Sequence, residues 1–188
     1  MSSERTKSGI HGLDELIEGG FPKKRLTLVS GGSGTGKTIF AAQFLYQGAI
    51  AQEEPGVFLT FDESPDNIKT DMQRFSWNFN ELEKSNLISF VDGLGRDEEQ
   101  SITSPHFDFN SILLKVLAAA KKINAKRITI ESLSSVYFLS ENEKEARRSI
   151  QKLGLFVVKS KLTTLATSDY VSNPSSDCKT HGIEEKSA

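Results

Sequence analysis

The segment that most limits how this chain can fold is the glycine-rich run at residues 31–38, Gly-Gly-Ser-Gly-Thr-Gly-Lys-Thr. It fits the pattern G-x-x-x-x-G-K-[ST], in which a turn between a buried strand and a helix wraps a polyphosphate. Glycine reaches backbone angles that a side chain forbids, so the N–H groups of such a turn can point at the phosphates. The pattern predicts that the lysine contacts the β- and γ-phosphates and that the last hydroxyl binds Mg²⁺. The predicted ligands are Gly32, Ser33, Gly34, Thr35, Gly36, Lys37 and Thr38.

The alternative is a glycine-rich turn that matches the pattern by chance, and the flanking sequence argues against it. Residues 26–30 form a short apolar run with β character directly before the turn. Residues 39–51 follow with few helix-breaking residues and read as a helix. Strand, turn and helix therefore come in the order that a phosphate-binding loop requires.

Apolar runs and helical patterns alternate along the rest of the chain. We expect strands at residues 57–61, 87–91, 128–130 and 163–167. We expect helices at 64–75, 110–122 and 143–161, the first with Ser64 as its N-cap. Such alternation is typical of an α/β fold around a largely parallel sheet. The prediction is a single domain over residues 1–188, with a long polar loop at about 92–109 and a polar tail from Asp169.

Composition narrows the class of protein. The 188 residues are 37% hydrophobic and 26% charged, which is ordinary for a soluble globular protein with a substantial core. Cys178 is the only cysteine, so no internal disulfide can form, and we expect a cytoplasmic protein. No apolar run approaches the length of a membrane span, so membrane insertion is not expected. The net charge of −2 gives no sign of nucleic-acid binding.

Polar residues follow the predicted strands at the edge where ligands bind in open α/β sheets. Glu63 is the first candidate to orient or deprotonate an attacking water, and Asp62 is the second. The alternative is that both are solvated residues at the start of the next helix. Glu131 follows an apolar strand, where an acid that holds Mg²⁺ opposite Thr38 is expected, although aspartate is the usual residue. The alternative for Glu131 is a surface acid.

Five segments together resemble the KaiC-like ATPases of the RecA superfamily. They are residues 8–22 (SGIHGLDELIEGGFP), 61–65 (FDESP), 130–134 (IESLS), 164–168 (TLATS) and 181–185 (HGIEE). The resemblance covers nearly the whole chain, in the family's order. It implies a three-layer RecA-like fold in which the strand at 163–167 lies between the phosphate-loop strand and the strand before Glu131. It also implies that Ser168 lies near the γ-phosphate.

The same resemblance implies ATP and Mg²⁺ as ligands and a homo-oligomer, by analogy a hexameric ring with ATP between subunits. The sequence departs from the family at Lys24, where a glycine is usual, at Glu131, and in ending soon after residues 184–185. Relatives continue with strands whose basic residues reach the neighbouring nucleotide, so we expect slow hydrolysis and weaker assembly. The main hypothesis is a slow Mg²⁺-dependent ATPase that couples nucleotide state to assembly or signalling, with a possible protein partner. The alternatives are a non-hydrolysing ATP-binding regulator and a DNA-recombination module.

Overall fold

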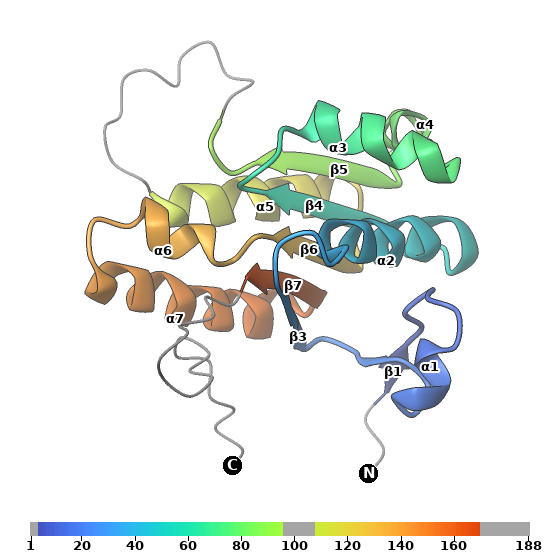
Figure 1. The fold of residues 1–188 in the computed structure, drawn as a ribbon, viewed down its shortest axis with the longest axis horizontal. Coiled ribbons are helices and arrows are strands. Elements are labelled where there is room, and N and C mark those ends of the chain that lie inside the picture. Colours follow the sequence, from blue (N-terminus) through green and yellow to red (C-terminus); the bar gives the residue numbers. More distant parts are fainter. Residues whose placement is uncertain (1–3, 96–107, 170–188) are drawn as a thin grey trace.

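A parallel sheet forms the centre of the molecule in the computed structural model, which describes residues 4–95 and 108–169 (Figure 1). Its strands lie in the order β3-β7-β6-β4-β5, and every neighbouring pair is parallel. The placement of β7 between β3 and β6 confirms the order that the family resemblance implied. The strands are β3 (Leu26–Gly31), β4 (Gly56–Thr60), β5 (Ile88–Asp92), β6 (Arg127–Glu131) and β7 (Thr163–Asp169).

Helices cover both faces of this sheet and complete three layers (Figure 1). One face packs against α2 (Lys37–Ala51), α3 (Pro65–Met72) and α4 (Phe79–Lys84). The other packs against α5 (Phe109–Lys122), α6 (Ser135–Leu139) and α7 (Glu143–Ser160). Side chains alternate between the faces of a strand, so Phe58 of β4 packs with α2 whereas Val57 and Leu59 pack with α5. Both faces are buried, which is why the strands read as continuous apolar runs.

Polar caps fix where several helices begin. Ser64 accepts a hydrogen bond from the N–H of Asn67 (3.3 Å) and precedes Pro65, which confirms the predicted start of α3. Asp108 and Asn142 cap α5 and α7 in the same way. These side chains satisfy N–H groups that the first turn of a helix would otherwise leave without an acceptor.

The chain before the sheet forms a small antiparallel pair, β1 (Arg5–Thr6) and β2 (Phe21–Pro22), with the short helix α1 (Leu13–Leu16) between them. Phe21 packs against the ring of Phe44 in α2, with 5.7 Å between the ring centroids. Lys24 has a φ of 61°, so the residue that replaces the family's usual glycine does adopt the left-handed conformation that favours glycine. Its N–H bonds to the Thr163 hydroxyl at 3.1 Å.

The structure adds elements that the sequence patterns did not predict. These are β1, β2, α1, α4 and α6, together with a 3₁₀ turn, η1 (Gln73–Phe75), that ends the predicted helix at 64–75. Each is too short to show a helical or strand period.

Trp77 stacks on Tyr46 and Phe75, at centroid distances of 5.6 and 4.9 Å, so it acts as a packing anchor.

Two predicted features lie largely outside the described residues. They are the central part of the loop at 92–109 and the polar tail beyond Asp169, which contains Cys178 and the segment 181–185. None of the helices in the described ranges combines the length and the apolar character that crossing a bilayer requires.

Candidate functional site

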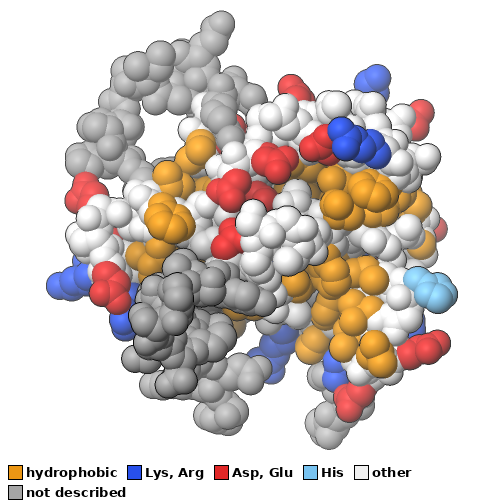
Figure 2. All heavy atoms as spheres, viewed as in Figure 1, with side chains coloured by type: hydrophobic (Ala, Val, Ile, Leu, Met, Phe, Trp, Pro, Cys, Tyr) orange, Lys and Arg blue, Asp and Glu red, His pale blue; other side chains and the backbone are white. Residues whose placement is uncertain are grey.

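A cleft of about 420 Å³ opens where β3, β4, β6 and β7 end. Parallel strands place their carboxyl ends at one edge, so residues far apart in sequence meet there. Acidic side chains gather near the middle of the face seen in Figure 2. Most of the predicted site residues line the cleft: Ser33, Gly34, Gly36, Lys37, Thr38, Asp62, Glu63 and Glu131.

The phosphate loop has the backbone geometry that its glycines predict. Gly34 and Gly36 have φ angles of 75° and 86°, in the region that side chains disfavour. Gly36 is the N-cap of α2 and carries no side chain to cap it, so the first N–H groups of the helix remain available to an anion. Gly32 and Thr35, also predicted as ligands, are not among the residues that line the cleft, and the Thr35 hydroxyl donates to the Gly32 carbonyl at 2.9 Å.

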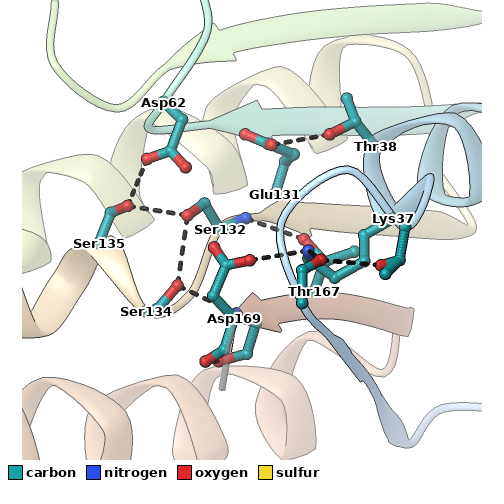
Figure 3. Close-up of polar contacts among 12 residues, drawn as sticks. Lys37, Thr38, Asp62, Glu131, Ser132, Ser134, Ser135, Thr167 and Asp169 are labelled. Atoms are coloured by element: carbon teal, nitrogen blue, oxygen red, sulfur yellow. Dashed lines mark hydrogen bonds and ion pairs between the residues drawn. The ribbon is translucent and has the colours of Figure 1, made fainter. Parts of the chain in front are cut away.

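Lys37 is held by two acceptors at the floor of the cleft. Its Nζ donates to the carbonyl oxygen of Gly32 at 2.7 Å and lies 2.7 Å from Oδ1 of Asp169 (Figure 3). The Lys37 side chain is 13% exposed, and that of Asp169 is 42% exposed. An ammonium group has three donors, so one remains for a phosphate oxygen, and the Asp169 carboxylate competes with phosphate for a second one.

Asp169 was not predicted as a site residue, whereas Ser168 was. Ser168 lies outside the lining of the cleft, and its hydroxyl donates to the carbonyl of Asp169 at 3.2 Å. Its neighbours Thr167 and Asp169 line the cleft instead. Successive side chains of a strand point to opposite sides, so residues 167 and 169 share the cleft side and residue 168 does not. The sequence did contain a signal for Asp169, because this acid lies two residues after the buried Thr167 and therefore on the same side of the strand.

Glu131 and Thr38, the predicted Mg²⁺ ligands, are in direct contact. The Thr38 hydroxyl donates to Oε1 of Glu131 at 3.1 Å (Figure 3). The Thr60 hydroxyl lies 3.0 Å from Oε2 of Glu131 and 2.7 Å from the carbonyl of Glu63. Glu131 is only 5% exposed, so it is not a surface acid, which was the alternative interpretation.

Burial raises the pKa of the Glu131 carboxyl above its ordinary value of 4.5. The hydrogen bonds from Thr60 and Thr38 lower this pKa, while the charges of Asp62 and Glu63 raise it further. The Thr60 hydroxyl carries a single proton and cannot donate fully to both of its acceptors. The ionised form of Glu131 therefore receives only a shared donor at Oε2, which agrees with the direction of the pKa shift.

Asp62 and Glu63 differ in how they are held. Asp62 accepts a hydrogen bond from the hydroxyl of Ser135 in α6 (Figure 3). The Glu63 backbone is fixed through its carbonyl to Thr60, while its side chain is exposed and lines the cleft. The side chain that caps α3 is that of Ser64. Both acids therefore line the cleft, as expected if one of them orients or deprotonates an attacking water.

The donor set fits a nucleotide-bound Mg²⁺. Thr38 and Glu131 offer the hard oxygen atoms that Mg²⁺ prefers, and they already converge on one point. Within residues 4–95 and 108–169, no three His, Cys, Asp or Glu side chains form a group that could hold a metal ion alone.

Comparisons with known proteins agree with this geometry. The profile of a family described as "ATPase: KaiC" matches residues 6–188. The circadian clock oscillator protein KaiC of Prochlorococcus marinus is 34% identical over 185 residues, which are 98% of this chain and 36% of that protein. UPF0273 protein MK0039 of Methanopyrus kandleri is 36% identical over 159 residues, 81% of this chain and 62% of that protein. The chain thus spans less than two thirds of the length of these relatives.

A solved structure gives the same result for the fold. The crystal structure of the KaiC-like protein PH0186 from Pyrococcus horikoshii OT3 superposes with a TM-score of 0.80 at 40% sequence identity. The match covers 90% of this chain and 73% of that one. The three-layer α/β architecture is therefore of the RecA type, as the family resemblance implied. With its profile match over residues 6–188, the chain belongs to the KaiC family of P-loop ATPases.

Proposed function

We propose that this chain binds ATP with Mg²⁺ in the cleft and hydrolyses it slowly. The observation that carries the proposal is the convergence of Lys37, the Thr38–Glu131 pair and the acids Asp62 and Glu63 on one cleft. A phosphate clamp, a metal-binding pair and a carboxylate beyond them are the parts that phosphoryl transfer requires. The family match over residues 6–188 supports treating the chain as a single ATP-binding domain.

Each part of the cleft has its own role in this proposal. The loop N–H groups and Lys37 bind the phosphates, while Thr38 and Glu131 would hold Mg²⁺, which supplies charge neutralisation at the β- and γ-phosphates. Glu63 orients a water and accepts its proton as the water oxygen bonds to the γ-phosphorus. The bond from the γ-phosphorus to the bridging oxygen breaks, and ADP and inorganic phosphate leave. Asp62, whose carboxylate is held by the Ser135 hydroxyl, provides a second polar contact beside that water.

One observation favours a second function, a regulator that binds ATP without turnover. Glu131 stands where aspartate is usual, and its carboxylate is engaged by two hydroxyls. Mg²⁺ tolerates poor geometry badly, so a longer acid that is already hydrogen-bonded can support binding better than it supports catalysis. In this case the nucleotide itself would be the signal.

Phosphate release from purified chain with ATP and Mg²⁺, compared with Glu63→Gln and Lys37→Ala, tests both functions. The ATPase requires turnover that Glu63→Gln reduces by about 100-fold or more and binding that Lys37→Ala weakens. Calorimetric binding of ATP–Mg²⁺ with no turnover in the wild type supports the regulator. Absence of binding overturns both.

We further propose a homo-oligomer with the nucleotide near subunit contacts, a hexamer by resemblance to the family, in the cytoplasm. Light scattering of the chain with and without ATP–Mg²⁺ checks the assembly. A mass that stays at that of one chain under both conditions contradicts it.

A further inference from the structure

Three serines lie in the turn that follows Glu131 and at the first position of α6. They are Ser132, Ser134 and Ser135. Ser132 is buried and has a φ of 61°, an uncommon conformation for a residue with a side chain. A serine at the start of a helix usually caps it. Ser134 is the N-cap of α6, yet its side chain makes no capping hydrogen bond. These hydroxyls therefore serve contacts other than helix capping.

Backbone N–H groups of the turn and the Ser134 hydroxyl bind the turn to the end of β7. The N–H of Ser132 donates to the Thr167 hydroxyl at 2.9 Å, and the N–H of Leu133 donates to the Thr167 carbonyl at 2.7 Å. The N–H of Asp169 donates to the Ser134 hydroxyl oxygen at 3.3 Å. The turn thus has a fixed position relative to the strand whose last residue pairs with Lys37.

The hydroxyls of the turn continue toward the opposite side of the cleft. Oγ of Ser132 lies 3.4 Å from that of Ser134 and 2.8 Å from that of Ser135, and Ser135 reaches Asp62 (Figure 3). Each hydroxyl has one proton. Because the Ser135 proton goes to the carboxylate, Ser132 must donate to Ser135, and Ser134 must then donate to Ser132. The chain of donors runs in one direction, from the Asp169 N–H to the Asp62 carboxylate.

We infer that this serine chain positions Asp62 for the hydrolysis of ATP, with Ser135 as the positioning residue in contact with it. The inference rests on the proposed ATPase. Hydrogen bonds that point in one direction polarise one another, so the last donor binds the carboxylate more firmly than an isolated hydroxyl does. The Ser135 hydroxyl bonds to Ser132 and Asp62, so it acts on the cleft through Asp62. The serine chain therefore links Asp62 to the end of β7, where Asp169 pairs with Lys37.

The test measures steady-state ATP hydrolysis by the full chain carrying Ser135→Ala, Ser135→Thr or Ser140→Ala. Ser140 is the matched control, because it is a half-buried serine at the other end of α6 whose hydroxyl donates to the Val136 carbonyl at 2.7 Å. We expect Ser135→Ala to lower kcat about 10-fold with KM unchanged, since small misplacements of groups beside the reacting atoms cost up to ~100-fold. Ser135→Thr, which keeps the hydroxyl, restores most of the rate, and Ser140→Ala leaves it unchanged.

A second pair of variants tests whether the three serines act as one series of hydrogen bonds. Ser134→Ala interrupts it upstream, so we expect a smaller loss of kcat, and the double variant Ser134→Ala/Ser135→Ala should be no slower than Ser135→Ala alone. Additive losses would overturn a serial chain. Loss of thermal stability and ATP affinity together with kcat in Ser135→Ala would show a structural role instead.

The wild type distinguishes failure of this inference from failure of the proposed function. If the wild type turns over ATP and Ser135→Ala matches it, the positioning role is wrong while the ATPase stands. If the wild type binds ATP without turnover, the proposed hydrolysis is wrong, and the inference falls with it.

Discussion

Replacement of Glu131 by glutamine should stabilise the fold at pH values where the wild-type carboxyl is ionised, above its raised pKa, while it weakens Mg²⁺-dependent ATP binding. The reason is that the Thr60 hydroxyl has one proton and two acceptors. These are the Glu63 carbonyl at 2.7 Å and Oε2 of Glu131 at 3.0 Å. With Glu131 ionised, the two acceptors must share this proton. A glutamine Nε2 can donate to the Thr60 oxygen and leave the Thr60 proton to the Glu63 carbonyl.

The size of the effect follows from the cost of an unsatisfied buried acceptor, about 1–3 kcal/mol. For a domain of this length, that free energy corresponds to a rise in Tm of about 2–12 °C. The dependence on pH has a definite sign. From 4.5 upward to the raised pKa of folded Glu131, the folded chain binds more protons at this residue than the unfolded chain does, so the stability of the wild type falls as pH rises. The glutamine variant lacks this loss.

The assay is urea unfolding of both chains at about pH 5 and pH 8, with a chelator and without nucleotide. The difference in unfolding free energy between Glu131→Gln and the wild type should be larger at the higher pH than at the lower one, because the folded wild type loses the proton of Glu131 as pH rises. Glu53→Gln, at an exposed position, is the control and should change stability little at either pH. A glutamine variant that is no more stable than the wild type at pH 8, or whose advantage does not change with pH, would refute the reasoning.

Other perturbations have equally direct outcomes. Asp169→Asn removes the anion that competes for Lys37, so calorimetry should show ATP–Mg²⁺ binding about 2- to 5-fold tighter, the range of an exposed ion pair; weaker binding would mean that Asp169 orients the lysine. Glu54→Ala leaves the 1%-exposed Arg127 without the carboxylate 2.6 Å from its Nε, and urea unfolding should show a loss of about 3 kcal/mol, whereas a loss below about 1 kcal/mol would contradict the pairing. Gly48→Ala would place a Cβ 2.6 Å from the Arg127 side chain, and thermal unfolding should show a loss of about 1–3 kcal/mol; an unchanged Tm would show that Arg127 can move aside.

The parts of the site that the sequence predicted share one property, which is that their signal is local. The phosphate loop is a run of eight consecutive residues with its strand and helix on either side. Asp62, Glu63 and Glu131 lie at the ends of buried strands, and parallel strands bring such positions to one edge whatever their order in the sheet. The strand order itself came from the family resemblance, because apolar runs alone do not state their neighbours.

The contacts that define the chemistry have no local signal. Thr38 and Glu131 are 93 residues apart, Thr60 and Glu131 are 71 apart, and Ser135 and Asp62 are 73 apart. Ser168 shows the limit most clearly, since a shift of one residue along a strand moves a side chain to the other face. The short helix α6, which brings Ser135 to Asp62, has no room for a helical period and forms because Val136 packs into the core.

The sequence by itself determined the phosphate loop, the alternation of strands and helices, and the acids at the strand ends, because each depends on residues adjacent in the chain. Only the tertiary structure decided which donors those acids meet, that Glu131 shares one proton of Thr60 with a backbone carbonyl, and that Asp169 rather than Ser168 reaches Lys37. Hydrogen bonds depend on distances of a few tenths of an ångström and on direction, and packing of the whole sheet and both helical layers sets these.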